Sequence, residues 1–530
     1  MKKKISLANI EGLLTIIFVV VIQNYVSDYG MGFFCTACCF VAFVSSLLFG
    51  GMKETVAKMV SIRMNRGMHN NARKVFKTCL LYTVLLGIVL NGFLWLFGDG
   101  FSQIFFHSVY PSIMIKLLGV LVVIRGLVAI INGFYMGIGN SSAVNISVGL
   151  YCIALVACAP FAMFFMGGYG KKVTALLNNQ MFIPLYMLIG AVLALLAASL
   201  VSLLFLVMVY RRVTDHLNYN QKERGMGRHD SEKRVIRAVT GLRLKVCYEK
   251  IFLYMAGFLF CVIFMDRDGK AVVETAFSNV GIMFAKCMLP IAFVLLAFEE
   301  YIAKEKYMLH VDFNREEKRN VVLRSQYMIK NTGFLLLPIV IMLLVVTEPF
   351  LRILYSGDAT VAINSFRLCI PLLFLLGLCV VLKGILSALG EKKASFIISA
   401  AAFLAHIIFA LLFHDSMEKI FYAVYVFSFI HIAGHLVWMQ RIIRMDWVDV
   451  VVKYLKVMLS CLAVTILEFI LNHFVTMNAF LLVLSIVLGY FVFYVVMVLL
   501  RGISKKDATS LKGTIAYVPV SFISNKLGMW

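Results

Sequence analysis

Fourteen apolar runs, separated by short charged or turn-rich segments, constrain this chain more than any other feature. A run of about 20 apolar residues crosses the hydrocarbon core of a bilayer as a helix. Apolar residues make up 62% of the 530 residues and charged residues only 15%, which excludes soluble, disordered and disulfide-scaffold proteins. The predicted spans are 7–27, 31–52, 75–96, 112–138, 142–166, 183–210, 251–267, 271–298, 328–355, 360–388, 394–413, 417–440, 452–475 and 478–500.

The basic residues fall mainly on alternate loops. If the N-terminus is cytoplasmic, 39 of the 50 Lys and Arg lie on inner segments, five on outer loops and six within spans. Positive charge accumulates on the cytoplasmic side of membrane proteins, so we predict a multi-pass protein with both termini in the cytoplasm. The net charge of +23 then contacts anionic lipid headgroups, and no nucleic-acid partner is needed to explain it.

An internal repeat divides the chain. Gly133 to Gly139 and Gly384 to Gly390 end the fourth and tenth spans at an offset of 251 residues, and the second and eighth spans end alike. The glycines suit helix packing or turn formation, with substrate contact as the alternative. The predicted fold is all-α: two six-helix repeats plus a C-terminal helix pair. The predicted parts are an N-terminal lobe 1–210, a basic linker 211–250, a C-terminal lobe 251–443, helices 13 and 14 at 444–501, and a cytoplasmic tail 502–530.

Several stretches, taken in order, resemble a known family. Residues 49–58 look like the turn after the family's helix 2, and residues 66–77 look like the basic segment that leads into its helix 3. Residues 125–139 look like its helix 4, 383–390 like its helix 10, and 504–507 like the end of its last helix. The chain resembles the multidrug/oligosaccharidyl-lipid/polysaccharide (MOP) exporter superfamily over nearly its whole length. Within that superfamily it looks most like the polysaccharide-biosynthesis branch, which includes stage V sporulation protein B and MurJ-like flippases.

The resemblance implies a transporter of a bacterial cytoplasmic membrane, not an enzyme. It would flip a lipid-linked (polyprenyl-diphosphate) oligosaccharide or cell-wall precursor by alternating access, as a monomer without a cofactor. Two departures leave the glycan open among lipid II, capsule, O-antigen, teichoic and spore-cortex precursors. The helix-1 region reads Ile22-Gln23-Asn24-Tyr25 instead of carrying arginine, and residues 31–52 carry no charge. The absence of a GxxxxGK[ST] loop means that no ATP site is predicted, and the coupling ion stays open.

Three cations lie deep within the predicted spans: Arg125, Lys286 and Arg367. A charge at bilayer depth costs several kcal/mol unless it is paired or faces water, which makes each a candidate for substrate contact. Guanidinium and ammonium groups would replace the water around a diphosphate. The alternative is that each cation locks helices through a salt bridge or a capped carbonyl. The predicted substrate-binding residues are Arg125, Lys286, Arg367, Glu11, Asn132, Glu274 and Asn364.

Other polar groups within the spans indicate no metal or catalytic centre. The spacing of His431 and His435 could chelate a metal, but a polar cavity wall or a helix–helix hydrogen bond is favoured because no carboxylate accompanies them. Cys35, Cys38 and Cys39 lie in an apolar run and suit helix packing. No role can be assigned to Glu468.

Two other functions remain open. An ion-coupled exporter of drugs or organic cations would need a carboxylate-rich cavity, whereas the deep charges here are mostly cations. A non-transport scaffold for envelope or spore-wall assembly would recruit enzymes through the basic segment 211–250, although a solvated linker also explains that segment.

Overall fold

The computed structural model describes residues 7–219, 231–268, 273–355, 360–413, 417–474 and 478–502, and these residues form helices joined by short turns. The predicted tail 502–530, apart from its first residue, and residues 220–230 of the linker lie outside this part. Among the described residues, twelve helices are long and apolar enough to cross a membrane. A bent helix pair makes a thirteenth, and the shorter apolar segment Ile10–Gln23 corresponds to the first predicted span. The chain is a multi-pass, all-α membrane protein, which confirms the predicted fold class.

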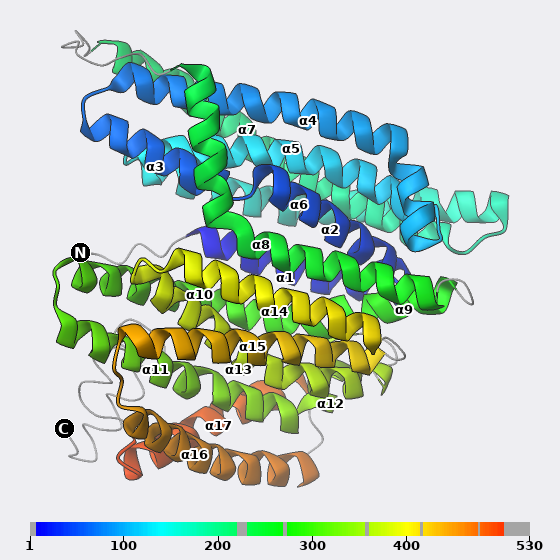
Figure 1. Ribbon diagram of the computed structural model, residues 1–530. Coiled ribbons are helices and arrows are strands. Elements are labelled where there is room, and N and C mark those ends of the chain that lie inside the picture. The colour runs from blue at the N-terminus through cyan, green and yellow to red at the C-terminus, as the bar shows by residue number, and fades with distance from the viewer. Residues whose placement is uncertain are drawn as a thin grey trace. The chain divides into compact units, whose positions relative to one another are not determined.

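The chain divides into two compact units, Met1–Ala285 (unit 1) and Lys286–Trp530 (unit 2). This division falls inside the eighth predicted span, and the lobe limits 1–210 and 251–443 remain a prediction from the repeat. A π-helical segment, η1 (Ile282–Met288), runs across the division. The helices of unit 1, labelled in Figure 1, are α1 (Leu7–Gln23), α2 (Asp28–Phe49), α3 (Met52–Asn65), α4 (His69–Phe106), α5 (Tyr110–Gly137), α6 (Ser141–Leu177), α7 (Phe182–Tyr219), α8 (Glu232–Asp268) and α9 (Val273–Gly281). Those of unit 2 are α10 (Leu289–Asn314), α11 (Lys318–Val345), α12 (Thr347–Leu354), α13 (Thr360–Ala388), α14 (Lys392–Leu412), α15 (Met417–Ile442), α16 (Trp447–Phe474) and α17 (Ala479–Leu499).

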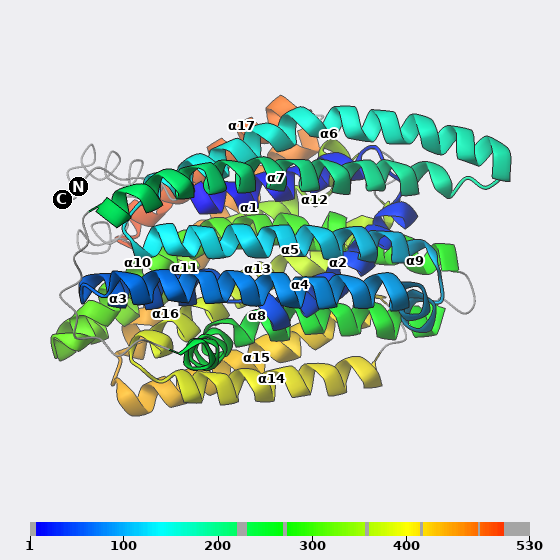
Figure 2. The same ribbon diagram turned by 90° about the horizontal axis from the view of Figure 1, so that it is seen from above.

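Unit 1 is built around α5. Helices α2, α3, α4 and α7 all pack against α5, and α6 pairs with α7 along most of its length (Figure 2). Apolar side chains of α3, α4 and α5, among them Val56, Phe76 and Phe134, form its buried core together with α8. This arrangement holds the polar groups of α5 between neighbouring helices.

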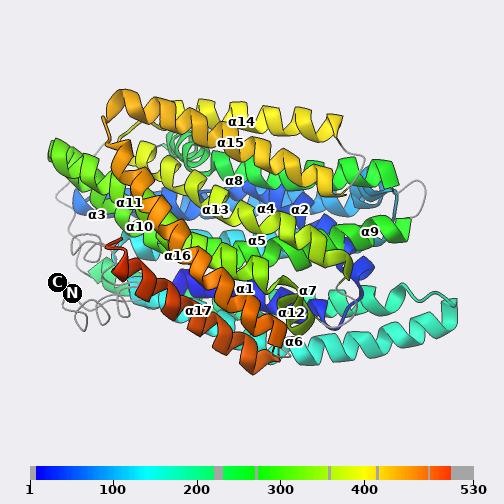
Figure 3. The ribbon, with the colours of Figure 1, turned by 90° about the horizontal axis from the view of Figure 1, so that it is seen from below.

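Unit 2 repeats this pattern around α13. Helices α10, α11 and α15 pack against α13, and α14 pairs with α15. The added C-terminal hairpin, α16 and α17, packs on α11, as Figure 3 shows. Buried side chains such as Phe334, Val457 and Phe493 join the hairpin to α11. The hairpin is therefore an integral part of unit 2.

The two glycine turns noted in the sequence have the same geometry. Gly139 and Gly390 adopt φ angles of 82° and 85°, in the left-handed region that glycine enters without strain. The residue after each glycine donates its backbone N–H five residues back, Asn140 to Tyr135 and Glu391 to Leu386. The 251-residue offset is thus a structural repeat of a helix C-terminal turn.

The preceding glycines let α5 approach α3 closely. A Cβ on Gly133 would lie 2.6 Å from the Lys53 carbonyl oxygen, and one on Gly137 would lie 2.7 Å from Val60. To make room for these Cβ atoms, the backbone at Lys53 or the β-branched side chain of Val60 would have to move. Helix packing, rather than substrate contact, explains both residues.

Substitution Gly133→Ala is therefore expected to lower the free energy of unfolding by about 1–3 kcal/mol, because the added methyl group would force α5 away from α3. Gly149→Ala is the matched control, since a Cβ at Gly149 meets nothing within 4 Å. Thermal unfolding of both variants in one detergent measures the difference. Equal melting temperatures would contradict the role assigned to Gly133.

Two segments expected to be loops are helical. The predicted linker 211–250 contributes the end of α7 and the first half of α8, which bends by 61° between Tyr248 and Lys250. Most of the segment 167–182, between the fifth and sixth predicted spans, belongs to α6. Polar composition suggested loops, but packing stabilises these helices. Arg243, buried on α8, donates a 2.7 Å hydrogen bond to the Leu47 carbonyl of α2.

Candidate functional site

Arg125 lies midway along α5 and forms an ion pair with Glu11 of α1. Its Nη2 donates to Glu11 Oε1 across 114 residues of sequence. The Arg125 side chain is 37% exposed and the Glu11 side chain 17%, so the pair is partly accessible. The deepest cation of unit 1 is therefore neutralised by the only carboxylate predicted on the first span.

Helix α6 supplies the rest of this site. The Arg125 guanidinium lies over the ring of Tyr151, 4.6 Å from its centre, and Tyr151 is buried. Two turns further along α5, Asn132 accepts a 3.4 Å hydrogen bond from the Ser147 hydroxyl. Arg125 and Asn132, seven residues apart, share a face of α5. They contact Tyr151 and Ser147 of α6, which are four residues apart. Tyr151 was missed because an aromatic residue in an apolar run carries no sign of its partner.

Lys286 is 3% exposed and lies within η1. Pro290, in the first turn of α10, has no N–H to offer the carbonyl of Lys286 four residues earlier. A shift to π-helical bonding accommodates such a break, and π segments occur frequently at functional sites. The lysine thus lies at an irregular point of its span. Glu274 belongs to α9, but its side chain lies outside the part that the structure describes.

Arg367 is exposed, whereas Lys286 is buried. Arg367 and Asn364, three residues apart on α13, are both exposed. Within the described residues Arg367 forms no ion pair, in contrast to Arg125. Pro371 follows Arg367 by four residues inside α13, which is the spacing between Lys286 and Pro290. The guanidinium of Arg367 is therefore available to a ligand.

The seven predicted residues thus fall into separate groups. In unit 1 the structure brings Arg125, Glu11 and Asn132 onto the α1–α5–α6 contact. In unit 2 Arg367 and Asn364 form an exposed polar face of α13. The side chains of each group can bind an anion, a sugar hydroxyl or a carbonyl.

The two histidines join α14 and α15. Ser395 and His435 are 3.1 Å apart, and Ser399 and His431 are 3.2 Å apart. Their rings stack with centres 4.0 Å apart and are almost fully buried. Of the two alternatives favoured from the sequence, a polar cavity wall and a helix–helix hydrogen bond, the structure shows the hydrogen bond. No three His, Cys, Asp or Glu side chains of the described residues could hold a metal ion together.

One ion-pair network in unit 2 was missed by sequence reasoning. Arg324 of α11 contacts Asp312 at 2.7 Å and Glu305 at 3.1 Å, both on α10. Lys330 pairs with Asp449 of α16. In the sequence Arg324 and Lys330 are part of the inner-segment charge, and no local pattern links them to acids on other helices.

Glu468 is fully buried in the α16–α17 hairpin. A Cβ on Gly489 would lie 2.8 Å from its Oε1, so the glycine makes room for this carboxylate. The hairpin therefore carries a buried acid that the predicted site does not use.

The sequence and the fold of this chain are similar to those of known membrane transporters. Residues 314–412 match the MatE family model. The structure described as lipid II flippase MurJ, inward closed conformation, has a TM-score of 0.61 at 15% identity, covering 93% of this chain and 97% of that chain. A multidrug resistance MATE family transporter of the MOP superfamily, inward-facing, has a TM-score of 0.60 at 14% identity, covering 83% and 96%.

A further neighbour is a MOP superfamily transporter from Pyrococcus furiosus, with a TM-score of 0.52 at 14% identity, covering 83% of this chain and 99% of that chain. No curated protein matches the sequence. The predicted resemblance is confirmed: residues 314–412 carry the MatE sequence pattern, and the chain has the fold of the MOP superfamily of membrane transporters.

Proposed function

We propose that this protein is a transporter, not an enzyme, and that it flips a lipid-linked polyprenyl-diphosphate oligosaccharide or cell-wall precursor across the membrane by alternating access. The observation that carries this proposal is the extent of the fold match. The MurJ structure covers 93% of this chain and the MATE structure 83%. The difference is about as long as the α16–α17 hairpin, Trp447–Leu499. We take the longer match to the flippase structure as support for a lipid-linked substrate.

The charges of the candidate residues support the same substrate class. Arg367 is exposed on α13 without an ion pair among the described residues, and Lys286 lies within a π-helical turn. Guanidinium and ammonium groups bind phosphate oxygens through charge-assisted hydrogen bonds. We assign Arg367 to the diphosphate and Asn364, on the same face, to the adjoining sugar. In unit 1 we keep Arg125, Glu11 and Asn132 as a second group of candidate substrate residues. Lys286 and Glu274 remain candidates from the sequence alone.

The charge distribution supports a proposed orientation in the membrane. We propose a bacterial cytoplasmic membrane, with both termini in the cytoplasm and the protein acting as a monomer without a cofactor. The inner-segment surplus of Lys and Arg supports this orientation. The candidate residues do not identify the glycan or a coupling ion.

The test uses the full-length protein in vesicles that contain a fluorescent undecaprenyl-diphosphate-linked sugar. A membrane-impermeant reagent that destroys outer-leaflet fluorophore is expected to reach nearly the whole lipid pool, whereas in protein-free vesicles it reaches only the outer-leaflet share. Equal accessibility with and without protein would contradict the proposal.

The same vesicles address the alternative of a drug or organic-cation exporter, which the MATE fold match favours. A cationic dye and an imposed sodium or proton gradient are added. Dye accumulation without lipid translocation would favour the exporter. The absence of both dye accumulation and lipid translocation would favour a scaffold.

A further inference from the structure

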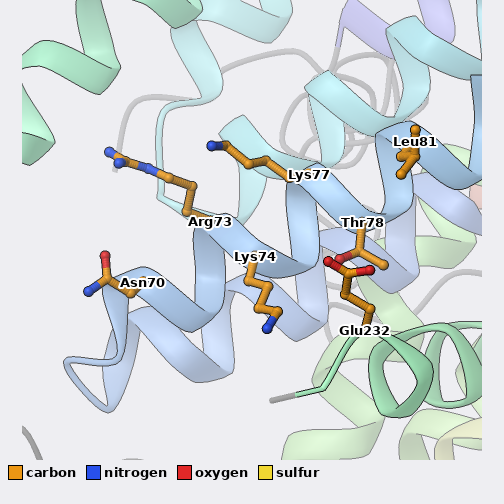
Figure 4. Close-up of a pocket in the computed structure, with 7 residues that line it drawn as sticks. All are labelled: Asn70, Arg73, Lys74, Lys77, Thr78, Leu81 and Glu232. Carbon is orange, nitrogen blue, oxygen red and sulfur yellow. The ribbon is translucent and has the colours of Figure 1, made fainter. Parts of the chain in front are cut away.

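A pocket in unit 1 lies where α4 begins, outside the site described above. Its cavity volume is about 270 Å³. Six of the lining residues are on α4, and Glu232 from the first turn of α8 completes the lining (Figure 4). The α4 residues are Asn70, Arg73, Lys74, Lys77, Thr78 and Leu81.

Three cations give the pocket its chemistry. Arg73, Lys74 and Lys77 follow one another at helical spacing near the N-terminus of α4, with Arg73 and Lys77 extending on one side of the helix and Lys74 on the other (Figure 4). Within the described part of the chain none of the three forms an ion pair. Glu232 leaves the pocket with two net positive charges.

The equivalent hairpin of unit 2 lacks these cations. Gly67 and Glu316 occupy matching positions with positive φ angles of 71° and 59°. The following residue of each hairpin bonds five residues back, Met68 to Arg63 and Glu317 to Asp312, an offset of 249. The positions of Arg73, Lys74 and Lys77 thus correspond to 322, 323 and 326, which hold Val, Leu and Gln. The basic pocket is a property of one repeat, not of the hairpin fold.

The position of the pocket along α4 indicates a lipid. At 1.5 Å per residue the 38 residues of α4 extend about 57 Å, well beyond the ~30 Å hydrocarbon core, so its first turns reach the headgroup layer. The face that carries Lys77 continues into Leu81, Leu85 and Ile88, which are 55%, 55% and 65% exposed. A free phosphate would use the cations alone, whereas a lipid would use both the cations and this apolar stripe.

We propose that the α4 basic pocket binds the phosphate headgroup of an anionic membrane lipid, with the lipid chain along Leu81, Leu85 and Ile88. Arg73 and Lys77, which extend on the same side of α4, donate to the phosphate oxygens, and Lys74 adds positive charge from the other side of the helix. Glu232 opposes the bound anion and lowers its affinity. This binding site is separate from the proposed transport site and does not depend on it.

The experiment measures binding of fluorescent phosphatidylglycerol to the full-length protein in detergent. Replacing Arg73, Lys74 and Lys77 together by Gln is expected to weaken binding about tenfold or more. The matched control replaces three exposed cations of the unit 2 hairpin, Arg315, Lys318 and Arg319, by Gln and is expected to change binding less than about twofold. The variant Glu232→Gln should bind about two- to fivefold more tightly, because it removes the opposing charge. A loss of binding that is equal in the triple variant and the control would overturn the proposal.

Competition distinguishes the sources of phosphate. Undecaprenyl phosphate is expected to displace the fluorescent lipid, since it combines a phosphate with a long apolar chain, whereas inorganic phosphate and phosphatidylcholine are not. Displacement by inorganic phosphate as effective as by the lipid would overturn the assignment to a lipid. The melting temperature of each variant confirms folding. The vesicle translocation assay is run separately, so failure of this site and failure of the transport proposal are distinguishable.

Discussion

Substitution Arg367→Gln is expected to reduce lipid translocation about 100-fold or more, because it removes the charge-assisted hydrogen bonds that we propose Arg367 donates to the substrate phosphate. Arg367 is exposed on α13, and in the described residues no carboxylate neutralises it. A guanidinium that remains unpaired in a membrane span is retained where it contacts water or substrate. Replacing Arg367 removes a proposed ligand contact and breaks no ion pair among the described residues. The folded protein should therefore accumulate normally.

The measurement is the vesicle accessibility assay, with protein abundance and melting temperature determined in parallel. Arg352→Gln is the control, since Arg352 is an exposed cation held by Glu348 at 2.9 Å one turn away. Arg367→Lys should keep partial activity, because an ammonium retains the charge but not the planar, two-pronged geometry. Normal translocation by Arg367→Gln would remove this residue from the substrate site.

The second large effect concerns the Arg125–Glu11 pair. Either Arg125→Gln or Glu11→Gln alone is expected to destabilise the protein by about 1–3 kcal/mol, because one charge is left unpaired within the span. This range is below that of a fully buried pair because the Arg125 side chain is 37% exposed. The double variant Glu11→Gln/Arg125→Gln should recover most of the loss, since both charges are then gone.

Thermal unfolding of the two single variants and the double variant forms a cycle that isolates the pair energy. Lys116→Gln serves as the control: its partner Asp99 is 56% exposed, and removing that surface pair should cost less than about 1 kcal/mol. Additive losses in the cycle would mean that Arg125 and Glu11 act independently. Translocation by the stable double variant then shows whether the pair also contacts substrate.

The sequence predicts which types of residue occupy the candidate site, but it does not predict which of them contact one another. The residue types at bilayer depth are visible in the sequence, and the seven-residue spacing of Arg125 and Asn132 places them on one helix face. The sequence offered no means to pair Arg125 with Glu11, 114 residues away, or to place its guanidinium over Tyr151. Arg125 and Arg367 are the same residue type in similar apolar runs, yet among the described residues Arg125 has an ion-pair partner and Arg367 has none.

The sequence by itself determined the helical spans, the distribution of charge along the chain and the repeat. These properties are local, because in lipid every backbone N–H and C=O must be bonded within its own helix, so apolar length alone specifies a span. Only the tertiary structure decided how far helices extend beyond the apolar run, as in α8, and which face of each helix meets another. Those outcomes depend on packing between segments far apart in sequence, such as Arg243 against Leu47. The paired Arg125, the exposed Arg367 and the basic pocket of α4 all follow from that packing.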